Sequence, residues 1–329
     1  MKNRRLAVAS ILAIMGISSA VLSLSAGTPA RASAANAPSA LQHIPPDYHF
    51  VAGIHVRRLT ESPFYLKLRQ EQPKAAQIGS ELSKFTARTG IDPARDISYL
   101  VLAGRSGQSA KPEGLMILTG NFDRNRITSF IRSQSAPVEM DYRGTSVMMI
   151  PDKNNASLKN GMAFLGEDEI AVGDIASLKA SLDTREAGGK NILSNPAISS
   201  LLSSMNLDEM FWFAGDAAAA MRESSLPVPP ALNTSSIQSI AGAFDIGEDF
   251  IGKITATAID LNSATKLADL IRGFIALGQL SGGKNPELKL LLDTVTVTQN
   301  AAQISLSFQI QGDMIKKLGH TKALPPGTI

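Results

Sequence analysis

The sequence predicts an α+β fold built as two similar halves, each a mainly antiparallel sheet with helices packed on one face. Three observations lead to this prediction. Short segments alternate between apolar and polar residues, as half-buried strands do. The helical patterns between them are short and begin at Ser, Asp or Asn residues that can cap a helix. The order strand, excursion, two strands, helix, two strands, helix occurs twice along the chain.

The composition is that of a globular protein. The chain has 329 residues, of which 44% are hydrophobic and 19% charged, so it can form one large domain or two of moderate size. Aromatic residues make up only 5%, and the core must therefore consist mainly of aliphatic side chains and Met. The absence of cysteine excludes disulfides, thiolate metal sites, a thiol nucleophile and a cysteine-linked lipid anchor.

Residues 1–35 are predicted to be a secretory signal peptide. Three basic residues stand within the first five positions, an apolar stretch follows from Leu6 to Leu24, and small residues in A-x-A order place cleavage near Ala32 to Ala37. The apolar stretch is also long enough to be retained as a membrane anchor, which is the alternative. After Sec-type export and cleavage, we expect a periplasmic or extracellular protein with no stable membrane span.

The charge of the mature chain argues against a nucleic-acid partner. Removing Lys2, Arg4, Arg5 and Arg31 with the leader lowers the formal net charge from +3 to −1. The high isoelectric point of about 9.0 therefore belongs to the leader. A nearly neutral mature protein does not provide the basic surface that binds nucleic acid.

Residues 36–46 are small and Pro-rich and are predicted to be a flexible lead-in, followed by a first half at 47–206. In this half, the strands are expected to alternate between apolar and polar residues. The helices are expected to start at Ser62, Asp123, Asp174 and Asn195. The expected elements are strands at 49–56, 97–104 and 114–122, hairpins at 138–152 and 162–174, and helices at 62–88, 124–133, 175–183 and 195–205.

The second half is predicted at 207–320, with a C-terminal tail at 321–329. Its expected elements are a strand at 210–216, a hairpin at 235–261, a helix at 262–278 capped by Asn262, a helix at 285–292, a hairpin at 293–310 and a helix at 312–320. Matching the two orders pairs the hairpin at 138–152 with the one at 293–310 and leaves the 162–174 hairpin as an addition. The halves could be separate domains meeting near residue 207, or could share one sheet.

This layout resembles a family of exported bacterial proteins of unknown function. The segments that carry the resemblance are "IPPDYHFVAGIHVRRLTESPFYLKL", "TGIDPARDISYLVLAG", "GNFDRNRITSFIRS", "YRGTSVMMI", "AFLGEDEIAVGDIASLKASLD" and "SNPAISSLL". They span most of the mature chain but contain no catalytic motif. The resemblance implies a duplicated α+β envelope protein and transfers no functional residue.

The segment from Leu115 to Ser133 tests whether a strand, a Gly turn and an acidic helix start form a ligand site. Related strand–cap–helix units recur at Asp174 and near Asn262. A helix needs such a polar residue because its first backbone N–H groups have no internal partner. We therefore interpret these units as scaffold.

Nucleotide, metal and nucleophile motifs are incomplete. "GEDFIGKI" and "GQLSGGKN" have the G-x4-G-K spacing but lack the following Ser or Thr of a P-loop. Ser281 and Lys284 fit S-x-x-K without its partner motifs. His49 and His55 are about 20 Å apart if they lie on one strand, too far to share a metal. The acidic turns "GEDE" and "DIGED" are expected to be solvated, although a weak surface calcium site there stays open. No catalytic residue, cofactor site or metal site is assigned.

Three functions follow for testing. The leading hypothesis is an exported, non-catalytic envelope protein that acts in binding or assembly with another envelope protein. The second is a periplasmic carrier of lipid or another apolar ligand, with the strand Phe211–Phe213 at its mouth, although that strand is interpreted first as core. The third is a hydrolase with an unrecognised site, which would need His49 or His55 beside an acidic residue and a Ser.

Overall fold

The computed structural model describes residues 38–66, 83, 86–87, 89–105, 113–152, 155–186, 190–217, 236–280 and 286–312. The predicted leader, the C-terminal tail, most of the helix at 62–88 and nearly all of the helix at 312–320 lie outside these residues. Within them, no helix is both long enough and apolar enough to cross a membrane.

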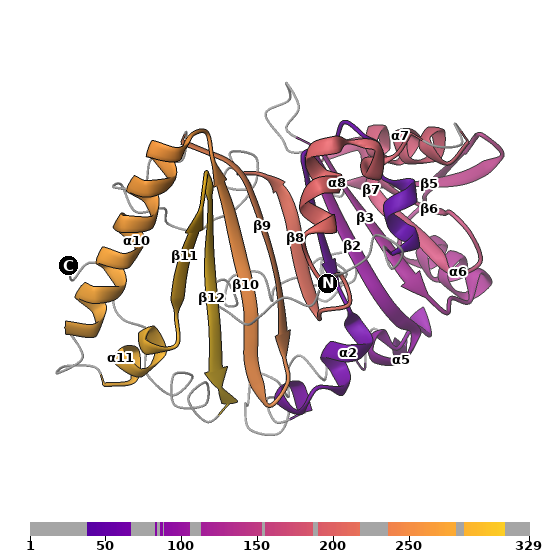
Figure 1. The fold of residues 1–329 in the computed structure, drawn as a ribbon. Helices are drawn as coiled ribbons and strands as arrows, with labels where there is room; N and C mark the ends of the chain where they lie inside the picture. Colours follow the sequence, from indigo (N-terminus) through magenta and orange to yellow (C-terminus); the bar gives the residue numbers. More distant parts are fainter. Residues whose placement is uncertain are drawn as a thin grey trace.

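Twelve strands form one antiparallel sheet (Figure 1). The strands are β1 (Phe50–Ile54), β2 (Ile97–Arg105), β3 (Glu113–Gly120), β4 (Val138–Tyr142), β5 (Thr145–Asp152), β6 (Asn155–Phe164), β7 (Glu169–Asp174), β8 (Phe211–Asp216), β9 (Ile237–Ile246), β10 (Asp249–Ala258), β11 (Thr296–Asn300) and β12 (Gln303–Gln311). Their order across the sheet is β11-β12-β10-β9-β8-β1-β2-β3-β7-β6-β5-β4.

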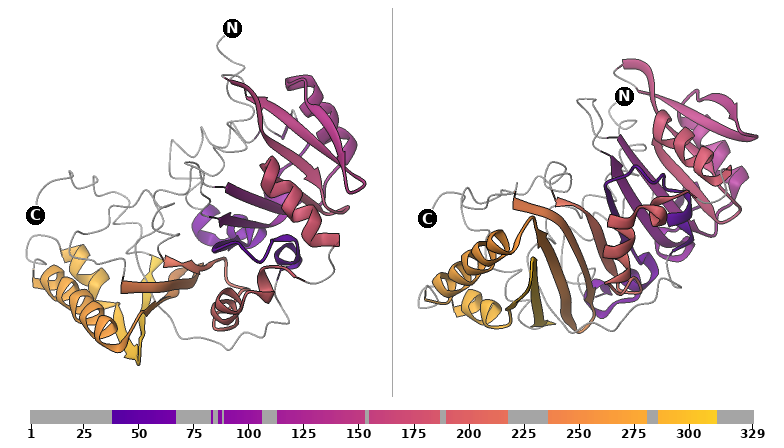
Figure 2. Two further views of the ribbon diagram at one scale, coloured as in Figure 1. Left: turned by 90° about the horizontal axis from the view of Figure 1, so that it is seen from above. Right: turned by 45° about the horizontal axis from the view of Figure 1, so that its top comes forward.

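The helical elements connect and cover these strands. They are η3 (Ser39–His43), α2 (Val56–Glu61), α5 (Pro93–Asp96), α6 (Arg124–Gln134), α7 (Ile175–Glu186), η4 (Ile192–Ser194), α8 (Pro196–Ser203), α10 (Leu261–Leu280) and α11 (Pro286–Asp293). Figure 2 shows α10 and α11 at one end of the molecule and the β4–β7 region, with α6 and α7, at the other. The α+β class is confirmed.

The two predicted halves share one sheet. Strands β1 and β8 pair with each other at its centre, from Phe50 opposite Gly215 to Ile54 opposite Phe211. The similarity of the halves and the boundary near residue 207 remain predictions. The expected match between the hairpins at 138–152 and 293–310 is wrong, because they occupy different places in the sheet. In the second half, β12 lies beside β10. In the first half, the corresponding place beside β3 is taken by β7, and the hairpin β4–β5 lies at the sheet edge.

Helices lie on both faces of the sheet in the first half, not on one as expected. Leu178 of α7 packs with Ala171 on one face, and Ile127 of α6 packs with Ile170 on the other. The reason is that β3 and β5–β7 are apolar on both sides, as in Leu115 to Leu118, and each side must be shielded from water. We refer to these as the α7/α8 face and the α6/α10 face.

The segment predicted to be a flexible lead-in is packed into the core from residue 39 onward. Leu41 and Ile44 are fully buried, and the Ile192 N–H donates to the Ile44 carbonyl over 2.7 Å. The flexible-lead-in prediction is wrong for this part because its few large apolar side chains fill the space between α7 and η4. Small and Pro-rich composition outside those positions masked the signal.

Helix starts follow the predicted caps with one exception. Asp123, Asp174 and Asn195 each accept a backbone N–H of the first turn, over 3.0, 2.9 and 3.1 Å. The Ser62 hydroxyl likewise accepts the Tyr65 N–H. The exception is α10, which is capped by Asp260 rather than by Asn262, through the Ser263 N–H over 2.7 Å. These contacts support the scaffold interpretation of the strand–cap–helix units.

Candidate functional site

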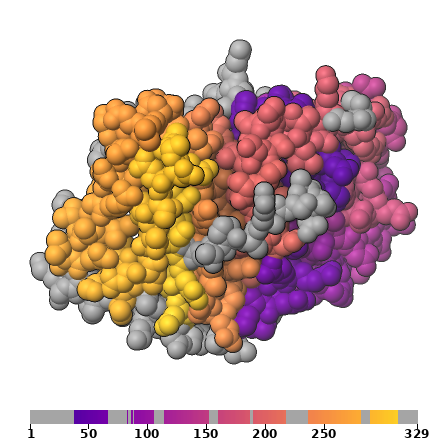
Figure 3. All heavy atoms as spheres, viewed as in Figure 1, coloured from indigo at the N-terminus to yellow at the C-terminus, as the bar shows by residue number. Residues whose placement is uncertain are grey.

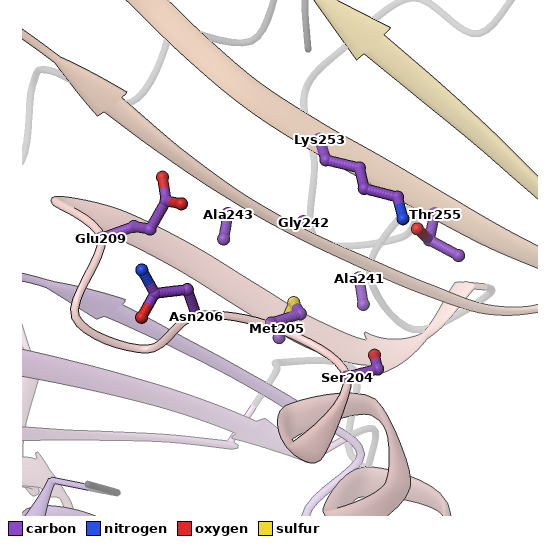
Figure 4. A pocket seen from close by; sticks show the side chains of 9 residues that line it. All are labelled: Ser204, Met205, Asn206, Glu209, Ala241, Gly242, Ala243, Lys253 and Thr255. Atoms are coloured by element: carbon purple, nitrogen blue, oxygen red, sulfur yellow. The ribbon is translucent and has the colours of Figure 1, made fainter. Parts of the chain in front are cut away.

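A small pocket with a mixed polar and apolar lining lies where the α8–β8 loop meets the α7/α8 face of β9 and β10 (Figure 4). Its volume is about 30 Å³, enough for one or two water-sized groups. The residues that line it are Ser204, Met205, Asn206, Glu209, Ala241, Gly242, Ala243, Lys253 and Thr255.

Strand register and loop hydrogen bonds position these side chains. Lys253 lies opposite Ala243 and Thr255 opposite Ala241, so all four share one face of the sheet. Ser204 ends α8 and donates its hydroxyl to the Leu201 carbonyl, while the Asn206 side chain accepts the Asp208 N–H. The loop is therefore held by its own polar groups.

Two charged residues stand at opposite ends of the pocket. Burial, and then the nearby negative charge of Asp245, raise the pKa of Glu209. Asp245 is itself held by Arg58 and by the Met210 N–H, each over 2.8 Å. The Lys253 amine points toward Thr255, away from Glu209 (Figure 4), and makes no ion pair with another described residue.

A second polar cluster joins the N-terminal segment to β7. His43 Nε2 contacts Glu169 Oε2 over 2.7 Å, and the Ser39 hydroxyl donates to Glu169 Oε1 over 2.6 Å. Burial raises the pKa of Glu169, but the hydrogen bonds from His43 and Ser39 outweigh it, and the pKa is lowered overall. Ser39 donates to the carboxylate rather than to His43, so the cluster lacks the nucleophile–base hydrogen bond of a hydrolase.

The residues named for a hydrolase are not brought together. His49 and His55 flank opposite ends of β1, and His49 is exposed. The His55 ring packs edge-on against Tyr99, with centroids 4.4 Å apart, and burial followed by the charge of Arg58 lowers its pKa. His320, Ser281 and Lys284 lie outside the described residues.

The aromatic strand divides between the two faces. Trp212 is 1% exposed on the α7/α8 face and donates its indole N–H to the Tyr99 hydroxyl, so it is core, as first interpreted. Burial raises the pKa of Tyr99, and this hydrogen bond opposes the rise. Phe211 and Phe213 are half-buried on the other face.

Sequence reasoning missed Glu169 and Asp245. Both belong to acidic turns that we expected to be solvated, yet Glu169 is 5% exposed and Asp245 is half-buried. That expectation holds for Glu167, Asp168 and Glu248, which are exposed. It is wrong for Glu169 and Asp245 because their partners, His43 and Arg58, are more than 120 residues away in the chain. No local pattern reports such a pair. Within the described part of the chain, no cluster of three or more His, Asp or Glu side chains suits a metal ion.

The P-loop-like segment "GEDFIGKI" forms the turn between β9 and β10 and the start of β10, without a following helix. This agrees with its rejection as a phosphate loop, because a P-loop needs a helix after the glycines.

No protein-family model matches the chain, and no curated protein does. Two solved structures, crystal forms IV and I of TP0453, superpose with TM-scores of 0.47 and 0.46 at 8% identity. They cover 85% and 86% of this chain and 96% and 97% of their own. A likeness at this level carries no argument about function.

Proposed function

We propose that this is an exported, non-catalytic protein of the cell envelope that binds a protein partner through the outer surface of α10 and α11. Export rests on the predicted signal peptide. A non-catalytic role rests on the incomplete motifs, on the contact of His43 with Glu169 and on the packing of the His55 ring against Tyr99. The single observation that carries the binding role is the distribution of exposed apolar side chains.

Most large exposed apolar side chains of the described residues gather in one region. Eight such side chains are at least 45% exposed, and six of them lie between Ile259 and Leu290. The six are Ile259, Leu261, Phe274, Leu277, Leu280 and Leu290. Ile259 and Leu261 stand at the start of α10, whereas Phe274, Leu277 and Leu280 follow one another toward its end, where α11 with Leu290 packs against it. Single exposed apolar residues need no explanation, but a group such as this second one marks an interaction surface.

Helix α10 carries a second apolar stripe beside the one it buries. Ala264, Leu267 and Ala268 pack on the sheet. Leu270, Phe274 and Leu277 follow at intervals of four and three residues, which places them on a neighbouring stripe of the helix. Phe274 is 45% and Leu280 83% exposed. The buried stripe already fixes the helix on the sheet, so packing within the fold does not require the second.

The charges around this surface favour a protein over an anionic membrane. Arg272 is paired with Asp269 over 3.0 Å, and Lys289 with Asp293 over 2.8 Å. Among the described residues of α10 and α11, this leaves Lys266 as the single basic residue without an ion pair. A helix that lies on anionic lipid presents unpaired basic residues on its polar side. An apolar centre with a rim of mixed and mostly paired charges is instead the anatomy of a protein–protein interface.

Site-specific cross-linking in the producing cell tests this proposal. Because the chain has no cysteine, Phe274→Cys and Leu280→Cys each give a single thiol for a photoactivatable cross-linker. Gln303→Cys, exposed on β12, is the matched control. We expect one discrete protein adduct from both α10 positions and none from Gln303. Adducts to lipid alone, or equal labelling at all three positions, would contradict the proposal.

The carrier of an apolar ligand is a second candidate, favoured by the α6/α10 face of the sheet. Strand register places one residue from each of six neighbouring strands in a single row on this face. On β9 that residue is Gly242, and on the other five strands it is an apolar side chain. The five side chains are Leu306, Ile254, Phe213, Ala52 and Leu102. All five are half-buried. Native mass spectrometry of protein from its own host would show a small mass lost on denaturation if a ligand is carried, and a bare polypeptide otherwise.

A further inference from the structure

Strands β11 and β4 are the two edges of the described sheet. Each has five residues and is joined to its described neighbour by a two-residue turn, Ala301-Ala302 after β11 and Arg143-Gly144 after β4. An edge strand presents unpaired backbone N–H and C=O groups that a further strand can use. In Figure 3 the yellow atoms of the segment that contains β11 lie at the surface. Since length and turn agree, the side chains distinguish the two edges.

Register shows which backbone groups of β11 point outward. Asn300 and Gln303 close the two-residue turn, so they exchange hydrogen bonds, and bonded pairs then alternate along the antiparallel ladder. Thr298 is therefore bonded to β12. Val297 and Gln299 direct their backbone N–H and C=O groups the other way, toward the free edge.

A second copy of β11 matches this edge. Antiparallel pairing about a two-fold axis at Thr298 sets Val297 of one copy opposite Gln299 of the other, twice, and each such pair exchanges two hydrogen bonds. The same register sets Thr298 against its own copy and Thr296 against Asn300. No residue of β11 is charged, and Thr–Thr pairs across strands are favourable.

The same pairing is unfavourable at β4. By the same turn rule, Glu139 and Asp141 point their backbone groups outward there, and a two-fold axis at Met140 would set Glu139 of one copy against Asp141 of the other, twice. Arg132 holds Glu139 over 2.6 Å, but Asp141 makes no ion pair with a described residue. Like charges directly opposite are destabilising, and charged side chains are a common protection of an edge. Edge β4 is guarded against self-pairing, and β11 is not.

The apolar surface of α10 and α11 lies at the same end of the molecule as β11 (Figure 2). Helix α10 contacts β11, and α11 ends at Asp293, shortly before β11 begins at Thr296. A stable dimer buries about 800 Å² on each copy, more than a five-residue strand offers. A two-fold axis normal to the sheet keeps both α10 helices on one face of the joined sheet, one on each side of the axis. Their exposed apolar side chains can therefore supply further buried area.

We propose that two copies of this chain associate through the free edges of β11, so that the sheet continues across a two-fold axis at Thr298. The inference rests on the proposed function, because it names a second copy as the protein that the α10 and α11 surface binds. The formal net charge of −1 after loss of the leader lets two copies meet without strong mutual repulsion.

Disulfide trapping tests the register. Thr298→Cys gives the exported protein a single thiol, because the natural chain has no cysteine. Facing residues of a non-hydrogen-bonded antiparallel pair have Cα atoms about 4.5 Å apart, within the reach of a disulfide. We expect mild oxidation to convert most of the Thr298→Cys protein into a covalent dimer. Met140→Cys, the equivalent position on β4, is the matched control and should stay monomeric.

Light scattering after size exclusion tests the association itself. Thr298 is exposed and is held to β12 by its backbone, so Thr298→Lys should fold, which circular dichroism checks. We expect the natural protein to be a dimer and Thr298→Lys to raise the dissociation constant at least tenfold, because two ammonium groups would face each other. Mixing Thr298→Lys with Thr298→Glu should restore the dimer. Ser200→Lys, exposed on α8, adds the same charge far from β11 and should change nothing.

The proposal is overturned if the natural protein stays monomeric at submillimolar concentration, or if Thr298→Cys and Met140→Cys form covalent dimers equally. If the α10 thiols capture a different protein in the cell while the purified protein is monomeric, the second copy is refuted and the proposed function stands. If Thr298→Cys forms the dimer but neither α10 position gives a protein adduct, the α10 surface is refuted and the pairing of β11 stands.

Discussion

Replacing Gly53 with Ala tests the packing at the centre of the sheet. Gly53 lies on β1 opposite Val101 on one side and Trp212 on the other. A methyl group at Gly53 would overlap the indole ring of Trp212 at three of its atoms, far inside van der Waals contact. The ring is not free to turn, because it is 1% exposed and donates its N–H to the Tyr99 hydroxyl.

The expected cost follows from two opposing contributions. Forcing a methyl group into a filled core costs about 1–3 kcal/mol, and disturbing the Trp212–Tyr99 hydrogen bond adds about 1 kcal/mol. The alanine also restricts the unfolded chain, which returns about 0.4–1 kcal/mol. We therefore expect a net loss of about 1–3.5 kcal/mol in the free energy of unfolding.

The only tryptophan reports its own environment, so fluorescence during urea unfolding measures this loss directly. Gly114→Ala is the matched control, because its added methyl would meet only the Ala103 carbonyl, 3.9 Å away. It should change the free energy of unfolding by no more than about 0.5 kcal/mol. Equal stability of the two variants would refute the close packing of Trp212 on β1.

Two further predictions concern the N-terminal segment. Leu41→Ala should lower the free energy of unfolding by about 2–5 kcal/mol, since Leu41 is fully buried. If urea unfolding showed a loss near zero, this segment would be a flexible lead-in after all. Glu169→Gln should flatten the pH dependence of stability below the reference pKa of 4.5. The folded-state pKa of Glu169 is depressed, so its contribution is complete above about pH 4.5 and is lost as the pH falls through the folded value. Urea midpoints from about pH 6 to 3 check this, with Glu167→Gln in the exposed turn as control; identical curves would contradict it.

The sequence predicted most elements because their signals are local. Alternation marked β9, β10 and β12, and cap residues such as Asp123 and Asn195 marked helix starts within a residue or two. The start of α10 was predicted too late in the chain because Asp260 and Asn262 can both cap a helix. The hydrogen bond from the Ser263 N–H to Asp260 shows which of the two does so.

What the sequence did not predict depends on distant parts of the chain. The place of β7 beside β3, the burial of Leu41 and the His43–Glu169 contact each join segments whose proximity no short pattern encodes. The same holds for the candidate site. Lys253 was noted only as part of a failed P-loop, and its alignment with Ser307 and Thr296 emerged only from strand register.

The place of β1 at the middle of the sheet affects how the chain can be made. Synthesis delivers β1 early, and β2 follows within about 50 residues, but its other neighbour, β8, comes roughly 160 residues later. At typical translation rates that interval is about 10–30 s. Throughout it, one edge of Phe50–Ile54 has no partner strand, and unpaired edges invite association with other chains. The newborn protein therefore depends on shielding of this edge until Phe211–Asp216 arrives.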